Sequence, residues 1–165
     1  MFIFKTASPE QTFAFGRQMA QLVKPGFVLC LQGNLGAGKT LFVQGLAAGL
    51  GISEPVTSPT FTILNVYQAD LPVYHFDLYR LEQAEELYDI GFYEYTDAGG
   101  IAIIEWPDKF TGQLPDEYLW LEIKPGDLPT ERVITAKAEG VDYQRVCEEL
   151  KRIAGTCFRY SYPCV

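Results

Sequence analysis

The sequence predicts an α/β fold built around a central sheet. Short apolar runs alternate along the chain with segments whose apolar residues recur at helical spacing. The runs Phe27–Leu31 and Ile101–Ile104 are apolar throughout, which is typical of strands buried on both faces of a parallel sheet. A glycine-rich turn joins the first of these strands to a predicted helix, as in folds that bind phosphate groups at a helix N-terminus.

The N-terminal part of the chain predicts a weak strand at Phe2–Phe4 and then a helix. Ser8 suits the N-cap of this helix, because Pro9 fills the first turn and Gln11 completes a capping box. Pro25–Gly26 is expected to end it. The apolar residues that recur on its buried face are Phe15, Met19, Leu22 and Val23.

The rest of the chain continues the alternation of strands and helices. A helix at Lys39–Leu50 follows the glycine-rich turn and ends at Gly49 and Gly51. The other predicted elements are a strand at Phe61–Tyr67 with a hairpin partner at Val73–Phe76, a helix at Glu82–Ile90 that stops at Gly91, strands at Tyr118–Ile123 and Arg132–Ala138, and a last helix marked by Val146, Leu150 and Ile153.

Length and composition predict one domain over residues 1–155, followed by a C-terminal tail at 156–165 that lacks periodicity. The chain has 165 residues, of which 48% are hydrophobic and 21% charged, as in a globular protein with one core. Cys30 lies in an apolar run and is expected to be buried as a small hydrophobe. The spacing of Cys157 and Cys164 permits a disulfide, but nothing else indicates an oxidising compartment.

The charge balance argues against strong direct binding of nucleic acid. Acidic residues number 21 against 13 basic ones, which gives a formal net charge of -8. The N-terminus is too short for a signal peptide, and no apolar run approaches the ~20 residues of a membrane span. We therefore expect a cytoplasmic protein that does not associate with membranes.

The strongest motif is a phosphate-binding loop of the pattern G-x-x-x-x-G-K-[ST]. Its residues are Gly33, Asn34, Leu35, Gly36, Ala37, Gly38, Lys39 and Thr40. Glycines let the backbone N–H groups surround phosphate oxygens, and the helix N-terminus adds a partial positive charge. Lys39 would then reach the β and γ phosphates, and the Thr40 hydroxyl would ligate Mg²⁺. The alternative is a glycine-rich turn with an exposed lysine.

Two apolar runs end in carboxylates that can complete such a site. Glu105 follows Ile101–Ile104 and is the first candidate for holding Mg²⁺. Asp77 follows Val73–Phe76 and is the second, as a metal-shell acid or a base that orients water. In an open parallel sheet, ligands bind beyond the carboxyl ends of the strands, so both acids are expected beside the phosphates. A structural salt bridge or a helix cap is the alternative for each.

Other polar residues near these motifs have open roles. Ser58 and Thr60 lie in a proline-bent segment where nucleotide switches sense the γ-phosphate; the alternative is an ordinary turn. Trp106 is expected to pack in the core or to shield the phosphates. His75 is interpreted as a packed histidine rather than a general base. Arg80 is interpreted as a partner of Glu82 rather than of phosphate.

The chain resembles the bacterial TsaE (YjeE) ATPase family in four segments. In order, they are Gly33–Thr40 (GNLGAGKT), Thr57–Thr62 (TSPTFT), His75–Leu81 (HFDLYRL) and Ile104–Asp108 (IEWPD). The resemblance runs from Phe4 to Arg132 and into the last strand. It implies a P-loop NTPase-like three-layer fold with a mostly parallel or mixed sheet. It also implies weak Mg²⁺-dependent ATPase activity, with ATP or ADP bound, in support of tRNA threonylcarbamoyladenosine synthesis.

The resemblance also implies roles for partners and residues. The partner would be a TsaB–TsaD complex, which transfers threonylcarbamoyl to tRNA adenosine. The phosphates would be held by Gly36–Thr40, and Mg²⁺ by Thr40 and Glu105. Asp77 would assist hydrolysis. Switch-like roles would fall on Ser58 and Thr60, and contacts to the base or ribose on Thr6 and Ser8.

Three other functions are compatible with a phosphate-binding loop. A small-molecule kinase normally closes an arginine-bearing lid over the phosphates, whereas the six arginines here are scattered and no lid insertion is visible. A GTPase would carry an N-K-x-D element, which this chain lacks. A module that binds nucleotide without hydrolysing it is the third alternative. The sequence leaves self-association open.

Overall fold

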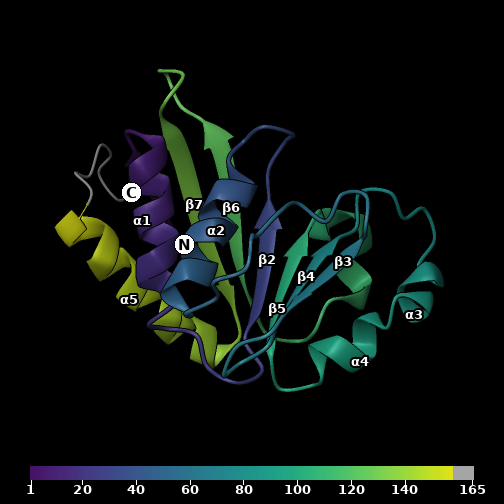
Figure 1. Ribbon diagram of the computed structural model, residues 1–165. Helices are drawn as coiled ribbons and strands as arrows, with labels where there is room; N and C mark the ends of the chain where they lie inside the picture. Colours follow the sequence, from purple (N-terminus) through teal and green to yellow (C-terminus); the bar gives the residue numbers. More distant parts are fainter. Residues whose placement is uncertain (158–165) are drawn as a thin grey trace.

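A computed structural model describes residues 1–157 and contains a seven-stranded mixed sheet with helices on both faces (Figure 1). The strand order across the sheet is β1-β7-β6-β2-β5-β4-β3. The strands are β1 (Phe2–Thr6), β2 (Val28–Gln32), β3 (Leu64–Tyr67), β4 (Val73–Asp77), β5 (Ile101–Glu105), β6 (Tyr118–Pro125) and β7 (Arg132–Glu139). This is the predicted three-layer α/β fold.

The middle of the sheet is parallel and its edges are antiparallel. Strand β2 pairs in parallel with both β5 and β6, and β5 pairs in parallel with β4. The predicted hairpin of β3 and β4 is antiparallel, as are the pairs β1–β7 and β6–β7. The carboxyl ends of β2, β4 and β5 therefore lie side by side at one end of the parallel strands, where ligands bind in open α/β folds.

Helices cover the two faces of the sheet. They are α1 (Pro9–Met19), α2 (Lys39–Gly49), α3 (Glu86–Asp89), α4 (Phe92–Thr96), the 3₁₀ helix η1 (Pro107–Gln113) and α5 (Val141–Cys157). Side chains of α1, α2 and α5, such as Phe15, Phe42 and Leu150, share one core cluster. The other cluster includes Phe92 of α4 and Phe110 of η1. Figure 1 shows α3 and α4 beyond the β4–β3 end of the sheet.

The first helix begins as predicted but ends early. The backbone N–H of Gln11 donates to Ser8 Oγ at 3.3 Å, so Ser8 is the N-cap. The Gln11 side chain accepts from the N–H of Ala7 at 2.8 Å, one residue before the cap. The helix ends at Met19 rather than at Pro25–Gly26, and the residues after it still pack partly against the core.

Three glycines let α1 and α2 pack closely. A Cβ added at Gly16 would lie 2.2 Å from the carbonyl oxygen of Phe42, and one added at Gly45 would lie 2.1 Å from that of Phe13. Gly49 is the last residue of α2, and a Cβ there would lie 2.5 Å from the Arg17 carbonyl oxygen. Its role is close packing as well as the predicted helix end.

Four other elements differ from their prediction. Strand β3 begins at Leu64 rather than at Phe61, and the helix predicted at Glu82–Ile90 is reduced to the four residues of α3. The sequence patterns did not predict α4. The buried core residues of α5 are Tyr143, Cys147, Leu150 and Ala154. Of the predicted stripe, Leu150 is buried, Val146 packs partly buried against the core, and Ile153 is half-buried.

The cysteine predictions have different outcomes. Cys30 is fully buried and burial raises the pKa of its thiol, so it behaves as the expected apolar residue. The tail from residue 158, with Cys164 and the possible disulfide to Cys157, lies outside the described residues. Within residues 1–157, no helix combines the length and the apolar character needed to cross a bilayer.

Candidate nucleotide site

The loop at residues 33–40 leaves the carboxyl end of β2 and enters α2 at Lys39. Gly36 and Gly38 have φ angles of 77° and 105°, a left-handed conformation that side chains other than glycine rarely adopt. The N–H of Ala37 donates to the Asn34 carbonyl at 3.0 Å and closes the turn. Left-handed residues in such a turn form a backbone nest that binds anions.

A close approach of two backbones explains Gly33 at the start of the loop. A Cβ added there would lie 2.6 Å from the carbonyl oxygen of Ile123 in β6. Only glycine lets the loop pass this close to the neighbouring strand.

Lys39 lies across the inside of the loop and is buried. Its Nζ donates to the carbonyl of Gly33 at 2.7 Å and to that of Asn34 at 3.3 Å. The same ammonium is 3.6 Å from Glu105 Oε2 and 5.0 Å from the centre of the Trp106 ring. The lysine is therefore bound to the loop's own carbonyls and lies beside a carboxylate.

Asp77 and Glu105 end two neighbouring parallel strands. They occupy paired positions of β4 and β5, and both are 2% exposed. Glu105 Oε1 is 2.8 Å from Nε2 of His75. Asp77 accepts from the hydroxyl of Thr60 at 2.8 Å and from the N–H of Tyr79 at 2.9 Å. Each acid is thus held by partners that order it at the edge of the sheet.

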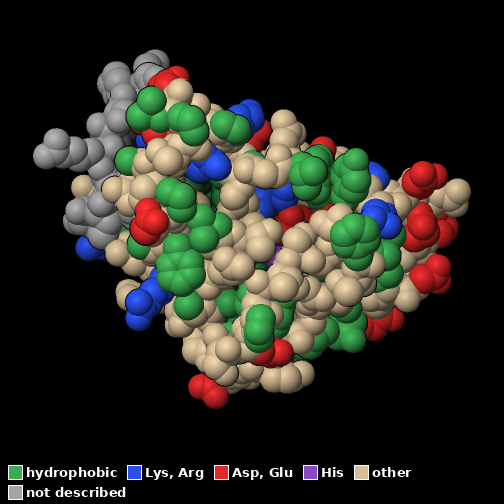
Figure 2. Space-filling view, turned by 45° about the horizontal axis from the view of Figure 1, so that its top comes forward, with side chains coloured by type: hydrophobic (Ala, Val, Ile, Leu, Met, Phe, Trp, Pro, Cys, Tyr) green, Lys and Arg blue, Asp and Glu red, His purple; other side chains and the backbone are tan. Residues whose placement is uncertain are grey.

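These groups line one pocket of about 380 Å³, which we call the loop pocket. Its lining residues are Leu35, Gly36, Ala37, Gly38, Lys39, Thr40, Leu41, Gln44, Ser58, Thr60, Asp77, Glu105 and Trp106. Basic and acidic side chains meet in a hollow near the centre of the face shown in Figure 2. The pocket combines a backbone nest, a buried ammonium, hydroxyls and two buried carboxylates.

The segment at residues 56–61 reaches this pocket through hydroxyl groups. The Thr60 hydroxyl donates its single proton to Asp77, so the Ser58 hydroxyl, 2.8 Å from it, is the donor of the bond between them. Ile63, which follows the segment, has a φ of 67°, unusual for a β-branched residue. Its carbonyl accepts from the Asp77 N–H at 2.9 Å. The segment and Asp77 are therefore linked through both side chain and backbone.

Comparison with known proteins assigns the chain to a family. Residues 6–134 match the family model described as "Threonylcarbamoyl adenosine biosynthesis protein TsaE". The chain belongs to the TsaE family. It is 47% identical over 151 residues to the Bacillus subtilis (strain 168) protein named tRNA threonylcarbamoyladenosine biosynthesis protein TsaE, covering 90% of this chain and 93% of the relative. The Treponema pallidum (strain Nichols) protein of the same name is 44% identical over 117 residues, covering 71% and 87%.

A solved structure supports the same assignment. The crystal structure of Bacillus subtilis YdiB is 41% identical to this chain and superposes with a TM-score of 0.80. The match covers 92% of this chain and 95% of YdiB. The fold described above is therefore the P-loop NTPase-like fold of the TsaE family.

The loop pocket of this TsaE-family chain contains most of the residues predicted from the sequence. Gly33 and Asn34 are outside its lining and hold Lys39 through their carbonyls. Thr6 is fully buried and shares a hydrogen bond of 2.7 Å with Thr12, while Ser8 caps α1. The structure gives these last two residues local roles, and their contact with a base or ribose stays a prediction.

The neighbours of the carboxylates have roles that the sequence left open. Trp106 lines the pocket, and its ring lies 4.9 Å from that of Tyr79. The Arg80 guanidinium lies 4.4 Å from the centre of the Phe61 ring, which is neither of its predicted contacts. His75 is fully buried as predicted, but it also bonds to Glu105.

Arg132 and Gln44 are site residues that sequence reasoning missed. Arg132 Nε donates to the Ala37 carbonyl at 2.7 Å and braces the loop from the start of β7. Gln44 Nε2 donates to the Val56 carbonyl at 3.0 Å and ties α2 to the segment at 56–61. Neither residue belongs to a local motif, so no sequence signal marked them.

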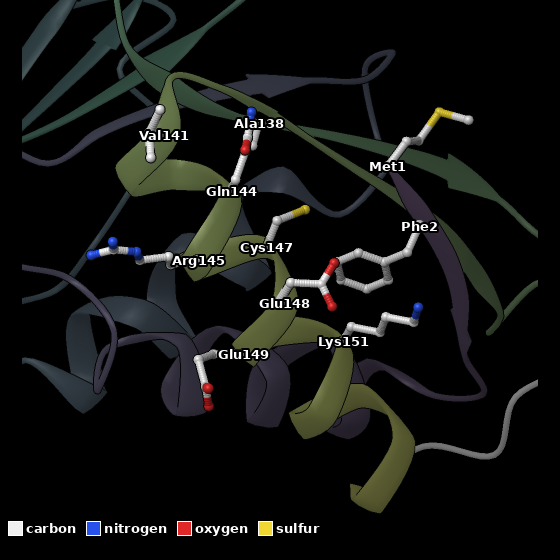
Figure 3. Close-up of a pocket in the computed structure, with 10 residues that line it drawn as sticks. All are labelled: Met1, Phe2, Ala138, Val141, Gln144, Arg145, Cys147, Glu148, Glu149 and Lys151. Atoms are coloured by element: carbon white, nitrogen blue, oxygen red, sulfur yellow. The ribbon is translucent and has the colours of Figure 1, made fainter.

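A larger hollow of about 770 Å³ lies elsewhere, between α5 and the strands β1 and β7. In Figure 3, Glu148 and Lys151 point toward Phe2, whereas Arg145 and Glu149 point away from it. Both glutamates are exposed to solvent, unlike the buried acids of the loop pocket. The features that suit phosphate chemistry are therefore found in the smaller pocket.

Proposed function

We propose that this TsaE-family protein binds ATP with Mg²⁺ in the loop pocket, hydrolyses it slowly, and acts in tRNA threonylcarbamoyladenosine biosynthesis on a TsaB–TsaD-like complex. Family membership supports the biosynthetic role. One observation supports the nucleotide chemistry most directly. The two acids Asp77 and Glu105 are far in sequence from Lys39 and Thr40, yet all four residues line the same pocket.

The loop suits the phosphate tail of a nucleotide. Its nest and the N-terminus of α2 offer N–H groups and partial positive charge to an anion. The Lys39 ammonium lies next to the loop and donates hydrogen bonds to two of the loop's carbonyls. Phosphate oxygens are stronger, charged acceptors, so they are expected to displace these carbonyls from the ammonium.

The donor set near the loop also suits Mg²⁺. Thr40 contributes a hydroxyl, and Glu105 a carboxylate, to one pocket. These are hard oxygen ligands, which Mg²⁺ prefers together with phosphate oxygens and water. A bound Mg²⁺ would neutralise charge on the phosphates. Asp77, ordered by Thr60, would orient the attacking water.

Phosphate release from ATP without an added acceptor tests the proposed activity and separates it from that of a small-molecule kinase. We expect Thr40→Ala and Glu105→Ala to lower the Mg²⁺-dependent rate by about 100-fold or more, because each removes a ligand that acts on transition-state charge. Thr111→Ala and Glu85→Ala, at exposed positions, are matched controls that should keep the rate. Variants Thr40→Ala and Glu105→Ala that hydrolyse ATP normally would contradict the assignment.

Exposed apolar side chains at the mouth of the pocket support a protein partner. Leu35 is 90% exposed, Phe61 is 82% exposed and Tyr79 is 54% exposed. Leu35 lines the pocket, Phe61 follows Thr60, and the Tyr79 ring packs tilted against that of Trp106. A partner that covers these residues would contact the loop and sense whether nucleotide is present.

A pull-down with TsaB and TsaD in ATP, in ADP and without nucleotide tests the partner. We expect capture to depend on the nucleotide and to be lost in the variant Phe61→Ser, which should still bind ADP because Phe61 lies outside the pocket lining. Equal capture under all three conditions would contradict a nucleotide-dependent association.

A further inference from the structure

His75 is a buried polar residue for which the proposed chemistry has no direct use. It lies in the middle of β4, is fully buried and bonds to Glu105 through Nε2 at 2.8 Å. Its other ring nitrogen, Nδ1, has no hydrogen-bond partner among the described residues. A buried nitrogen without a partner costs stability, so the fold alone would favour an apolar side chain here.

The pairing of β4 with β5 explains why the imidazole reaches this particular carboxylate. Asp77 pairs with Glu105, and His75 pairs with Ile103, in a parallel register. His75 and Glu105 are therefore diagonal neighbours on one face of the sheet, within reach of long side chains. The contact is fixed by two adjacent central strands rather than by a loop.

The two oxygens of Glu105 have different surroundings. Oε1 accepts the hydrogen bond from His75, since a carboxylate only accepts and Nε2 must donate. Oε2 lies 3.6 Å from the ammonium of Lys39, on the side of the phosphate-binding loop. The imidazole thus occupies one oxygen and sets the orientation in which the other meets the pocket.

We propose that His75 is a positioning residue that holds Glu105 in place for Mg²⁺, an inference that rests on the proposed nucleotide function. When Lys39 turns to phosphate oxygens, Glu105 loses its contact with the ammonium. The bond from His75 then keeps the carboxylate oriented while it changes from a partner of Lys39 to a metal ligand. Residues that orient metal ligands in this way tune metal affinity rather than touch the reacting atoms.

A Mg²⁺ titration of ADP binding, followed by calorimetry, tests this role without measuring hydrolysis. We expect His75→Leu to raise the Mg²⁺ concentration needed for half-maximal enhancement of ADP binding by about 10-fold or more. ADP binding in EDTA should stay as in the unsubstituted protein, because the loop is unchanged. Identical Mg²⁺ titrations for His75→Leu and the unsubstituted protein would overturn the proposal.

Rescue by a conservative variant separates positioning from packing. His75→Gln can place an amide N–H near the position of Nε2, whereas His75→Asn has the same chemistry but a shorter reach. We expect His75→Gln to restore the Mg²⁺ titration and His75→Asn to leave it shifted, and this pair decides the question if His75→Leu does not fold. Equal shifts in both would show a role in packing alone and overturn the proposal.

The partner residue supplies a second check. In a Glu105→Gln background, His75→Leu should shift the Mg²⁺ dependence no further, because the carboxylate that it positions is gone. An undiminished additional shift would overturn the proposal. Failure of the unsubstituted protein to bind ADP in either condition would instead contradict the proposed function itself, so the two failures are distinguishable.

Discussion

At the residue scale, Arg132 shows how a distant side chain holds the loop at residues 33–40. Its Nε donates to the Ala37 carbonyl at 2.7 Å, and its Nη1 donates to the carbonyls of Pro129 and Glu131. The planar guanidinium makes these contacts together, and a lysine ammonium cannot reproduce this geometry. The loop therefore depends on a residue 95 positions away in sequence.

We predict that Arg132→Lys weakens ADP binding by about 10-fold, equivalent to about 1.4 kcal/mol, because the loop is less firmly held in its binding conformation. Calorimetric titration with Mg²⁺-ADP measures the effect. Arg152→Lys changes an exposed arginine of α5 that pairs with Glu149 and should bind as the unsubstituted protein does. Equal affinity of the two variants would contradict the bracing role.

The site residues that the sequence predicted belong to local motifs or to strand ends. Residues 33–40 are contiguous, and Glu105 and Asp77 each follow an apolar strand, so their position at the edge of the sheet follows from general rules. The contacts His75–Glu105 and Arg132–Ala37 depend on which strands are neighbours and in which register. A single sequence does not contain that information.

At the element scale, the contact between α1 and α2 sets the position of the helix that carries Lys39 and Thr40. Gly45 of α2 faces the backbone of Phe13, and Gly16 of α1 faces that of Phe42. Helix backbones this close leave no space for a side chain at either position.

We predict that Gly45→Ala lowers the free energy of unfolding by about 1–3 kcal/mol, because its Cβ would lie 2.1 Å from the Phe13 carbonyl oxygen and force the helices apart. Urea unfolding followed by circular dichroism measures the loss. Gly112→Ala is the matched control, since no heavy atom lies within 4 Å of its Cβ, and it should be nearly neutral. A stability of Gly45→Ala equal to that of the control would contradict the close packing.

The elements that the sequence predicted best are the buried strands. The apolar runs at 28–31 and 101–104 predict strands that are buried on both faces, and both form central strands of the sheet. Helix ends were less predictable, as α1 shows by ending at Met19 although apolar residues continue. In the region 82–96 the helix stops at Gly91 as predicted, where φ is 69°, but α3 begins only at Glu86 and the short helix α4 follows the glycine.

At the scale of the whole molecule, the C-terminal helix is tied to the central strand of the sheet. The N–H of Val28, the first residue of β2, donates to the hydroxyl oxygen of Tyr143 at 2.7 Å. Burial raises the pKa of this hydroxyl, in keeping with the position of Tyr143 in the core that α5 covers. The bond joins residues 115 positions apart and connects α5 to the strand that leads into the loop at residues 33–40.

We predict that Tyr143→Phe destabilises the protein by about 1–3 kcal/mol, because it leaves the buried N–H of Val28 without an acceptor. Thermal or urea unfolding measures the change. Tyr88→Phe removes the hydroxyl of a tyrosine that is 68% exposed and should have little effect. Equal stability of these two variants would show that the bond to β2 contributes nothing.

The sheet order brings together parts of the chain that alternation alone could not place. The sequence indicated a mostly parallel or mixed sheet, but not that β6 would lie beside β2 or that β1 would pair with β7 at the edge. This order positions β7, with Arg132, next to β6, which is the strand that Gly33 of the loop approaches closely. Figure 2 shows acidic side chains gathered at the α3 side of this face, consistent with the net charge of -8.

A structure determined with Mg²⁺ and a non-hydrolysable ATP analogue tests the central claim most directly. We predict that the phosphates lie within residues 33–40, that Lys39 exchanges its bonds to Gly33 and Asn34 for phosphate oxygens, and that Mg²⁺ is held by Thr40 and Glu105. An analogue bound elsewhere, or a loop left empty at a concentration that saturates the protein by calorimetry, would contradict the account.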